Sequence, residues 1–200
     1  SNKYFANKHV SCLPIGYKSG TFYYKNKKVK RQYKWTFVGT PHKSSRHDLL
    51  FNLSDIKPSF CHKTKKFNEK IMAVEEMSKV LSSTKFIPCP NGFVHPETYR
   101  VYEALECGCI PIVENAYKYY DRLFPNNPFL KINKWIESKS IIEKWKEDPM
   151  YRLKIDHECY VYNHCFFDKN NFGTSIIFSE LRGVKIFSRQ DLSTDFFSFR

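Results

Sequence analysis

Short apolar runs alternate with helical patterns between residues 35 and 135, and this alternation constrains the fold most strongly. The apolar runs, each short enough for a buried strand, are residues 35–39, 59–62, 85–88, 109–113 and 129–132. Helical spacing or helix-end signals separate them. A series of strands and helices in this order predicts an α/β domain with a mostly parallel sheet. We therefore expect such a sheet to be flanked by helices.

Local signals suggest where the helices begin and end. We expect one helix from Ser44 or Ser45 to about Ile56, and a second from Phe67 to Leu81. The inward face of the second is predicted to carry Phe67, Ile71, Val74, Ser78 and Leu81. Pro96 suits the first position of a third helix, and Gly108 suits its C′ position.

Further helices are expected in the second half of the chain. One should run from Ser140 to Trp145, and Asp148–Pro149 should begin a long helix from about Met150 to Phe166. A last helix is expected over 170–183. His157 and His164 share a face of the long helix, where packing or surface roles are more common than metal binding, and no metal site is expected.

The composition favours a folded chain with an anionic partner. Hydrophobic residues make up 42% of the chain and aromatic residues 17%, which argues against disorder. The formal net charge of +13 favours nucleic acid, a membrane surface or a phosphorylated small molecule as partner. Such basic runs are as often a solvated surface as a binding site. Part of the charge lies in two early runs, Lys25, Lys27, Lys28, Lys30, Arg31 and Lys34, then Lys63, Lys65 and Lys66.

The seven cysteines form no CxxC pair, and their odd number argues against a fully paired disulfide framework. They are expected to be reduced core residues, which favours a cytoplasmic location, or the Golgi lumen if the chain is a trimmed ectodomain. No run of 18 apolar residues and no signal peptide occurs in the sequence.

The segment Lys85–Glu114 carries the most chemical information. Its strand is followed by a loop with Gly92 and then a helix, and ligands of open α/β sheets bind beyond the carboxyl ends of the strands. On that helix Arg100 and Glu103 share a face. An arginine fork suits a diphosphate, and a carboxylate suits the two hydroxyls of a ribose. On spacing alone, an ordinary intrahelical ion pair at the surface is the more common explanation.

The same segment resembles the exostosin-type glycosyltransferases. The resemblance lies in the Lys85-Phe86 strand, the Pro90-Asn91-Gly92 turn, the Arg100-x-x-Glu103-Ala104-Leu105 helix and the Gly108-Cys109-Ile110-Pro111-Ile112-Val113 strand. Pro14–Tyr17 and Trp35–Gly39 with Arg46 resemble the start of the same domain. The stretch from Tyr117 to Pro125 is similar to α1,3-fucosyltransferases, which share the fold.

The resemblance implies the C-terminal, nucleotide-sugar-binding domain of a GT-B enzyme, with a Rossmann-like, mostly parallel sheet flanked by helices. It implies inverting transfer from a nucleoside-diphosphate sugar, often UDP-linked, to a glycan or glycoprotein acceptor, with no required cofactor or metal. The residues that would bind the donor are Gly39, Lys43, Arg46, Asn91, Gly92, Tyr99, Arg100 and Glu103. The candidates for the general base are His95, Glu97 and Glu114, which lie on loops near the expected pocket, where a polar loop residue is more common than a base.

A GT-B enzyme also has an N-terminal acceptor domain, which is expected to have been removed or to come from another chain. We divide this chain into an N-terminal segment (1–34), a donor-binding domain (35–183) and a C-terminal tail (184–200). Two alternatives stay open: a nucleotide-sugar-binding module without activity, and a basic nucleic-acid-binding domain. The second is less favoured because no nucleic-acid-binding motif appears.

Overall fold

The computed structural model describes residues 15, 30–42, 45–66, 72–93, 95–124, 127–155 and 158. In this part of the chain a five-stranded parallel sheet has the order β2-β1-β3-β4-β5. Its strands are β1 (Tyr33–Gly39), β2 (Ser59–Lys63), β3 (Thr84–Cys89), β4 (Ile110–Glu114) and β5 (Leu130–Ile132). The helices are α2 (Arg46–Leu53), α3 (Val74–Ser82), α4 (Tyr99–Glu106), η1 (Ala116–Lys118), α5 (Tyr119–Leu123) and α6 (Ile136–Glu147).

The strand order contains one reversal of direction. The chain passes from β1 to β2 at one edge and then returns across β1 to β3, with Tyr33 beside Thr84 and Trp35 beside Phe86. The next strands, β4 and β5, then extend the sheet on the β3 side of β1. In doubly wound sheets the crevice at such a reversal is where ligands bind. The carboxyl ends of β1 and β3 therefore mark the expected site.

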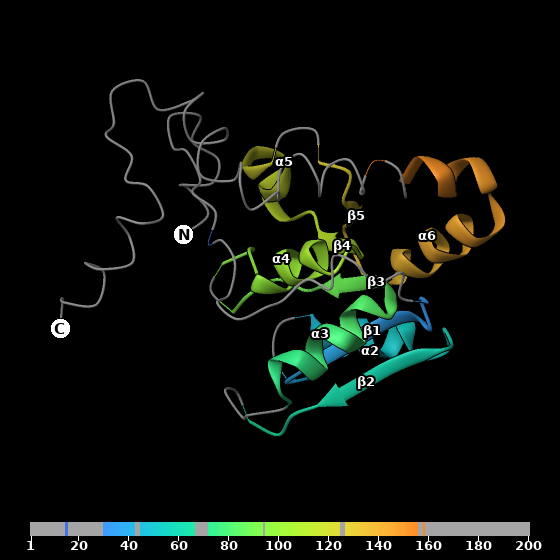
Figure 1. Cartoon of the computed structure of the whole chain (residues 1–200). Coiled ribbons are helices and arrows are strands. Elements are labelled where there is room, and N and C mark those ends of the chain that lie inside the picture. The colour runs from blue at the N-terminus through green and yellow to red at the C-terminus, as the bar shows by residue number, and fades with distance from the viewer. Residues whose placement is uncertain are drawn as a thin grey trace, which may run out of the picture.

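Two apolar clusters pack on opposite faces of the sheet. One combines α3, α4 and α5, with Leu81, Val101 and Tyr119 in its centre. The other combines α2 and α6, with Leu49, Leu53 and Ile142 against Trp35 and other strand residues. Figure 1 shows α3 and α4 lying over the strands of the sheet, with α6 to their right. This three-layer arrangement confirms the expected Rossmann-like α/β fold.

The expected order of strands and helices is also confirmed, including the helix stop at Gly108, whose φ is +65°. Asp148 acts as the expected N-cap, since its Oδ1 accepts a hydrogen bond from Tyr151 N at 3.0 Å. The chain is helical at 149–155. The remainder of that helix and the expected 170–183 helix lie outside the described residues.

Three expected details were wrong. The third helix begins at Tyr99 rather than at Pro96, because Thr98 caps it by accepting from Arg100 N at 3.4 Å. Val74, expected on the buried face of the second helix, is 40% exposed, whereas Ser78 and Leu81 are buried as expected, together with Ser82. Phe67 and Ile71 lie outside the described residues. The helix expected over 140–145 is part of the longer α6.

Arg31 closes the amino-terminal side of the sheet. Its Nη1 donates to the carbonyl oxygens of Ser82 at 2.7 Å, Thr84 at 2.8 Å and Cys107 at 3.1 Å. Its Nη2 donates to Cys107 and Gly108, at 3.1 and 2.7 Å. These carbonyls lie where α3 and α4 end, and helix ends leave carbonyl groups without intrahelical partners. The guanidinium of Arg31 therefore caps the C-termini of both α3 and α4.

Among the described residues no helix has both the length and the apolar character that crossing a bilayer requires.

We predict that Arg31→Ala lowers the free energy of unfolding by about 1.5–3 kcal/mol, because several carbonyls lose a charged donor. Urea unfolding followed by circular dichroism measures this change. Arg31→Lys should recover only part of it, since an ammonium lacks the planar fork. The neighbouring exposed Lys30→Ala serves as control and should change stability by less than about 0.5 kcal/mol. Equal effects of Arg31→Ala and Lys30→Ala would contradict the capping role.

Candidate functional site

The candidate site lies where β1 and β3 end, at the reversal of the sheet. β1 ends at Gly39, whose φ of +148° is a conformation that side chains rarely adopt. A Cβ built on Gly39 would meet no atom within 4 Å, so the backbone here faces open space. A ligand could therefore approach the main chain closely at this point.

Arg46 is the first residue of α2, directly across from this strand end. Its Nη1 donates to Thr40 O at 3.0 Å, and its guanidinium lies 4.9 Å from the centroid of the Phe93 ring. Burial lowers the pKa of Arg46, and the nearby positive charge of Arg100 lowers it further. The site thus holds two cations close enough to repel each other.

Arg100 lies in the first turn of α4 and bridges three elements. Its Nη2 donates to Val38 O on β1 at 3.0 Å, and its Nη1 lies 3.8 Å from Met77 Sδ on α3. Nη1 also pairs with Glu103 Oε2 at 2.6 Å, with side-chain exposures of 21% for Arg100 and 12% for Glu103. The ion pair allowed by the spacing therefore exists, but it is largely buried against the end of β1.

Among the described residues, seven buried side-chain polar atoms have no hydrogen-bond partner, and four of them lie near this edge: Ser45 Oγ, Arg46 Nε, Asn91 Oδ1 and Asn115 Oδ1. Ser45 precedes α2, and Asn91 lies on the loop after β3. Buried polar atoms are normally satisfied by protein or by ordered solvent. The other three, Ser78 Oγ, Ser82 Oγ and Glu106 Oε2, lie on α3 and α4. The four atoms at the edge can form hydrogen bonds with a ligand or with water.

The loop after β3 is tightly folded around Gly92. A Cβ on Gly92 would lie 2.7 Å from His95 O and 2.8 Å from Glu97 O, so only glycine fits. His95 Nδ1 accepts a hydrogen bond from Glu97 N at 3.3 Å, and the His95 ring packs edge-on against Tyr119. A neutral His95 in this arrangement carries its proton on Nε2, so that this nitrogen donates rather than accepts.

Glu97 is buried beneath this loop, with 4% of its surface exposed. Its Oε1 accepts from the Tyr102 hydroxyl and from Ile15 N at 2.9 Å, and its Oε2 accepts from the Tyr119 hydroxyl at 2.8 Å. These bonds join the loop to α4 and α5. Both oxygens of the carboxylate are thus engaged in holding the loop.

Glu114, at the end of β4, is engaged in a similar way. Its Oε2 accepts from Asn91 N at 2.7 Å, and its Oε1 accepts from the Trp135 indole nitrogen at 3.1 Å. Trp135 is fully buried before α6. Glu114 therefore connects the start of the loop to the far side of the sheet.

The structure places four of the expected donor-binding residues, Gly39, Arg46, Arg100 and Glu103, together at one sheet edge. Asn91 and Gly92 lie on the adjoining loop, and Tyr99 is 48% exposed at the start of α4. Lys43 lies outside the described residues. Sequence reasoning missed Phe93, Tyr102, Tyr119 and Trp135, the aromatic residues that hold the site residues in place.

We predict that Gly92→Ala lowers the free energy of unfolding by about 1–3 kcal/mol, because the new methyl group would overlap two backbone carbonyls. Gly39→Ala is the matched control. It imposes a strained φ without a clash, and it should lower the free energy of unfolding by a similar amount, about 1–3 kcal/mol. Crystal structures or amide chemical shifts distinguish the two. Gly92→Ala should displace residues 91–97, whereas an unmoved loop would contradict the prediction.

These features define a doubly wound, Rossmann-like α/β domain with two arginines at its ligand-binding edge. Residues 17–158 match the family described as "RXYLT1 C-terminal domain", and the chain belongs to this family. The expected C-terminal domain of a glycosyltransferase is thereby confirmed, under a family name different from exostosin.

One relative is the protein named ribitol-5-phosphate xylosyltransferase 1 from Danio rerio. It is 30% identical over 130 residues, which cover 62% of this chain and 30% of the relative. The chain thus spans less than a third of that relative's length. A solved structure described as an α1,3-fucosyltransferase is similar with a TM-score of 0.49 and 18% identity, covering 68% of this chain and 39% of the other.

Proposed function

We propose that this domain binds the donor of a glycosyltransferase that moves a sugar from a nucleoside-diphosphate sugar, with UDP as the nucleotide, to a glycan acceptor. The observation that carries the proposal is the pair of arginines, Arg46 and Arg100, at the reversal of the sheet. Family membership supports it independently.

The arginine pair suits a diphosphate on electrostatic grounds. The positive charge of Arg100 and burial both lower the pKa of Arg46, so an anion between the two side chains would relieve an existing repulsion. The open space beyond Gly39 leaves room for phosphate oxygens near the backbone. The unpartnered Arg46 Nε supplies a further donor.

Glu103 is proposed to bind the ribose. In the structure its carboxylate pairs with Arg100. A bound diphosphate would take over as partner of the Arg100 guanidinium, which leaves the carboxylate oxygens to accept hydrogen bonds from the ribose hydroxyls. Arg100 and Glu103 thus form a preassembled pair whose partners change when the donor binds.

The proposed reaction is inverting. The acceptor hydroxyl attacks the anomeric carbon from the side opposite the diphosphate, the bond to the diphosphate oxygen breaks, and a base takes the hydroxyl proton. Negative charge then develops on the departing diphosphate, where Arg46 and Arg100 are already in place to stabilise it. The proposal requires neither a metal ion nor a cofactor.

The name of the Danio rerio relative favours particular substrates within this class. Xylose is the proposed sugar, which makes UDP-xylose the first donor to examine. An acceptor that ends in ribitol 5-phosphate is proposed on the same ground.

We predict that UDP-xylose raises the thermal stability of the chain and that Arg100→Ala abolishes this effect. A donor at 100 times its dissociation constant should add about 2.7 kcal/mol. Arg46→Ala should weaken binding in the same way, while the exposed Lys79→Ala is the matched control and should bind normally. Differential scanning fluorimetry with UDP-xylose, UDP-glucose and GDP-fucose provides the readout. Shifts of equal size in Arg100→Ala and in the unmodified chain would refute the proposal.

A second candidate function, binding without transfer, is favoured by one observation. Of the three residues considered as general base, Glu97 and Glu114 have both carboxylate oxygens in hydrogen bonds, and His95 has Nδ1 occupied. We propose that these residues position the loop and that the base lies elsewhere. The isolated chain would then bind the donor without releasing UDP when acceptor is added.

A stability measurement separates a positioning role for Glu97 from a catalytic one. Glu97→Gln should lower the free energy of unfolding by about 1–3 kcal/mol, because a buried charged acceptor of three hydrogen bonds becomes an amide with one acceptor oxygen. Urea denaturation measures this loss. The exposed Glu76→Gln is the control and should have little effect. A stable Glu97→Gln variant with normal donor binding but no transfer would instead favour a catalytic role.

A further inference from the structure

Two asparagines, Asn91 and Asn115, follow the ends of adjacent strands at the carboxyl edge of the sheet. Cys89 on β3 pairs with Val113 on β4, so each asparagine lies two residues beyond a paired position. The Glu114 carboxylate accepts a hydrogen bond from Asn91 N at 2.7 Å, which joins the two segments there. In the described part of the chain, the Oδ1 atoms of both asparagines are buried and have no hydrogen-bond partner. Two amide oxygens that can each accept a hydrogen bond therefore lie at adjoining positions of this edge.

The turn that follows β4 fixes the position of Asn115. Asn115 N donates to Ile132 O at 2.7 Å, and Asn115 O accepts from Lys118 N at 3.2 Å. Tyr117 and Lys118 both have a positive φ, of 56° and 51°, which is uncommon for residues other than glycine. Such strained backbone costs conformational energy, and it is concentrated at binding and catalytic sites. The fold therefore maintains a strained turn directly beside an amide oxygen that lacks a partner.

The two asparagines lie beside the arginine pair, one and two strands further along the sheet. Arg100 donates to Val38 O at the end of β1, and β3 and β4 follow β1 in the strand order. Neighbouring strands are about 4.8 Å apart, which places the asparagines roughly 5–10 Å from the end of β1. A sugar attached to a diphosphate extends over a comparable distance from it.

The chemistry of this part of the edge differs from that of the arginine pair. An amide oxygen accepts hydrogen bonds from hydroxyl groups and cannot bond to the oxygen of an ionised phosphate. Glu114, directly before Asn115, has both carboxylate oxygens in hydrogen bonds and adds a negative charge. A neutral group with several hydroxyls would satisfy the amide oxygens. A ligand carboxylate would instead meet acceptor atoms and a like charge.

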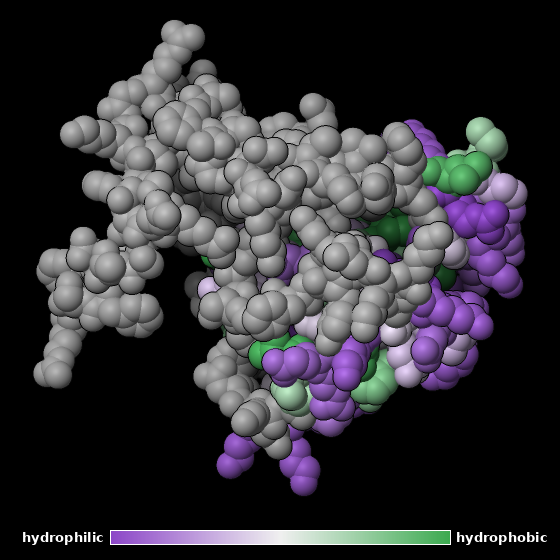
Figure 2. All heavy atoms as spheres, viewed as in Figure 1, coloured by the Kyte–Doolittle hydropathy of each residue, from purple (hydrophilic) through white to green (hydrophobic). Residues whose placement is uncertain are grey.

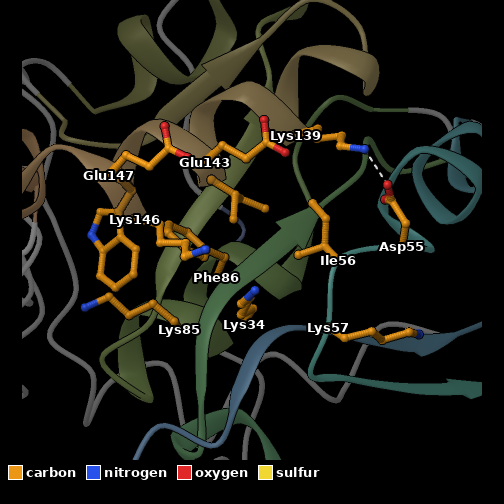
Figure 3. Close-up of a pocket in the computed structure, with 12 residues that line it drawn as sticks. Lys34, Asp55, Ile56, Lys57, Lys85, Phe86, Lys139, Glu143, Lys146 and Glu147 are labelled. Carbon is orange, nitrogen blue, oxygen red and sulfur yellow. Dashed lines mark hydrogen bonds and ion pairs between the residues drawn. The ribbon is translucent and has the colours of Figure 1, made fainter.

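The opposite, amino-terminal edge of the sheet does not offer the same chemistry. A hollow of about 360 Å³ lies there, and none of the buried polar atoms without a partner among the described residues belongs to its lining. Figure 3 shows Lys139 paired with Asp55 at one side of this hollow. Lys85 Nζ and Arg152 Cζ lie 4.7 and 5.9 Å from the centroid of the Trp145 ring. In Figure 2 the described surface on the α6 side is mostly hydrophilic, so the rim of the hollow belongs to a charged, solvated surface.

From these observations we infer that Asn91 and Asn115 form the subsite for the sugar of the donor, and that this subsite selects a neutral sugar over an acidic one. The assignment rests on the proposed function, in which Arg46 and Arg100 bind the diphosphate. The Oδ1 atoms of the asparagines accept hydrogen bonds from sugar hydroxyls, and Glu114 disfavours a sugar that carries a carboxylate. Asn115 is thus a specificity-determining residue of the donor site.

Isothermal titration calorimetry of the full chain with UDP and with UDP-xylose tests the role of Asn115. In Asn115→Ala the affinity for UDP-xylose should fall about tenfold, because a sugar hydroxyl loses its acceptor, whereas the affinity for UDP should change less than about twofold. The backbone hydrogen bonds of Asn115 do not involve its side chain, so the turn should be retained. Asn133→Ala, at an exposed position after β5, is the matched control and should bind both ligands normally. Asn91→Ala should show the same selective loss and serves if Asn115→Ala is unstable.

UDP-glucose and UDP-glucuronate test the selection by charge, since they differ only in the group at C6 of the sugar. UDP-glucuronate should bind at least about tenfold more weakly than UDP-glucose, because its carboxylate would lie near Glu114 and the amide oxygens. Equal affinities for these two ligands, or the failure of both to bind while UDP-xylose binds, would overturn the selection by charge.

The outcomes separate the sugar subsite from the proposed donor site. If neither UDP nor UDP-xylose binds the unmodified chain, the donor site itself is refuted. If both bind and Asn115→Ala lowers the two affinities equally, or leaves both unchanged, the sugar subsite is refuted and the donor site stands.

Discussion

The parallel pairing of β1 with β3 is the interaction on which the rest of this structure depends. It places two strands that are distant in sequence side by side, with β2 on one side and β4 on the other. Strands are added first on one side of β1 and then on the other. The helices that follow β1 and β3 therefore pack on opposite faces of the sheet. The crevice between them receives Arg46 from one helix and Arg100 from the other.

The two edges of the sheet have different chemistry for a geometric reason. At the carboxyl edge the strands end in a glycine and a tight loop, and charged groups come from the first turns of α2 and α4. At the amino edge the strand starts bring lysines side by side, and Arg31 satisfies the ends of two helices. Both edges carry cationic side chains: Arg46 and Arg100 lie at the carboxyl edge, and Arg31, Lys34 and Lys85 lie at the amino edge.

The loop between β3 and α4 is held in place by two carboxylates, one buried and one partly buried. Glu97 and Glu114 connect this loop to α4, α5 and the region before α6 through tyrosine, indole and backbone donors. Hydrogen bonds to a buried charge are among the stronger ones in proteins. The loop that is proposed to face the donor is therefore fixed by hydrogen bonds to these two carboxylates.

The sequence by itself determined the order of strands and helices, the stop at Gly108 and the pairing of Arg100 with Glu103, because each depends on local periodicity or on residues one helical turn apart. It also indicated Arg46 through resemblance. Only the tertiary structure decided that Glu97 and Glu114 accept hydrogen bonds from distant residues, that Arg31 caps two helices, and that Lys34 lies beside Lys85. Each of these contacts joins residues that are remote in sequence or depends on strand register, and no local pattern records which side chains a folded sheet brings together.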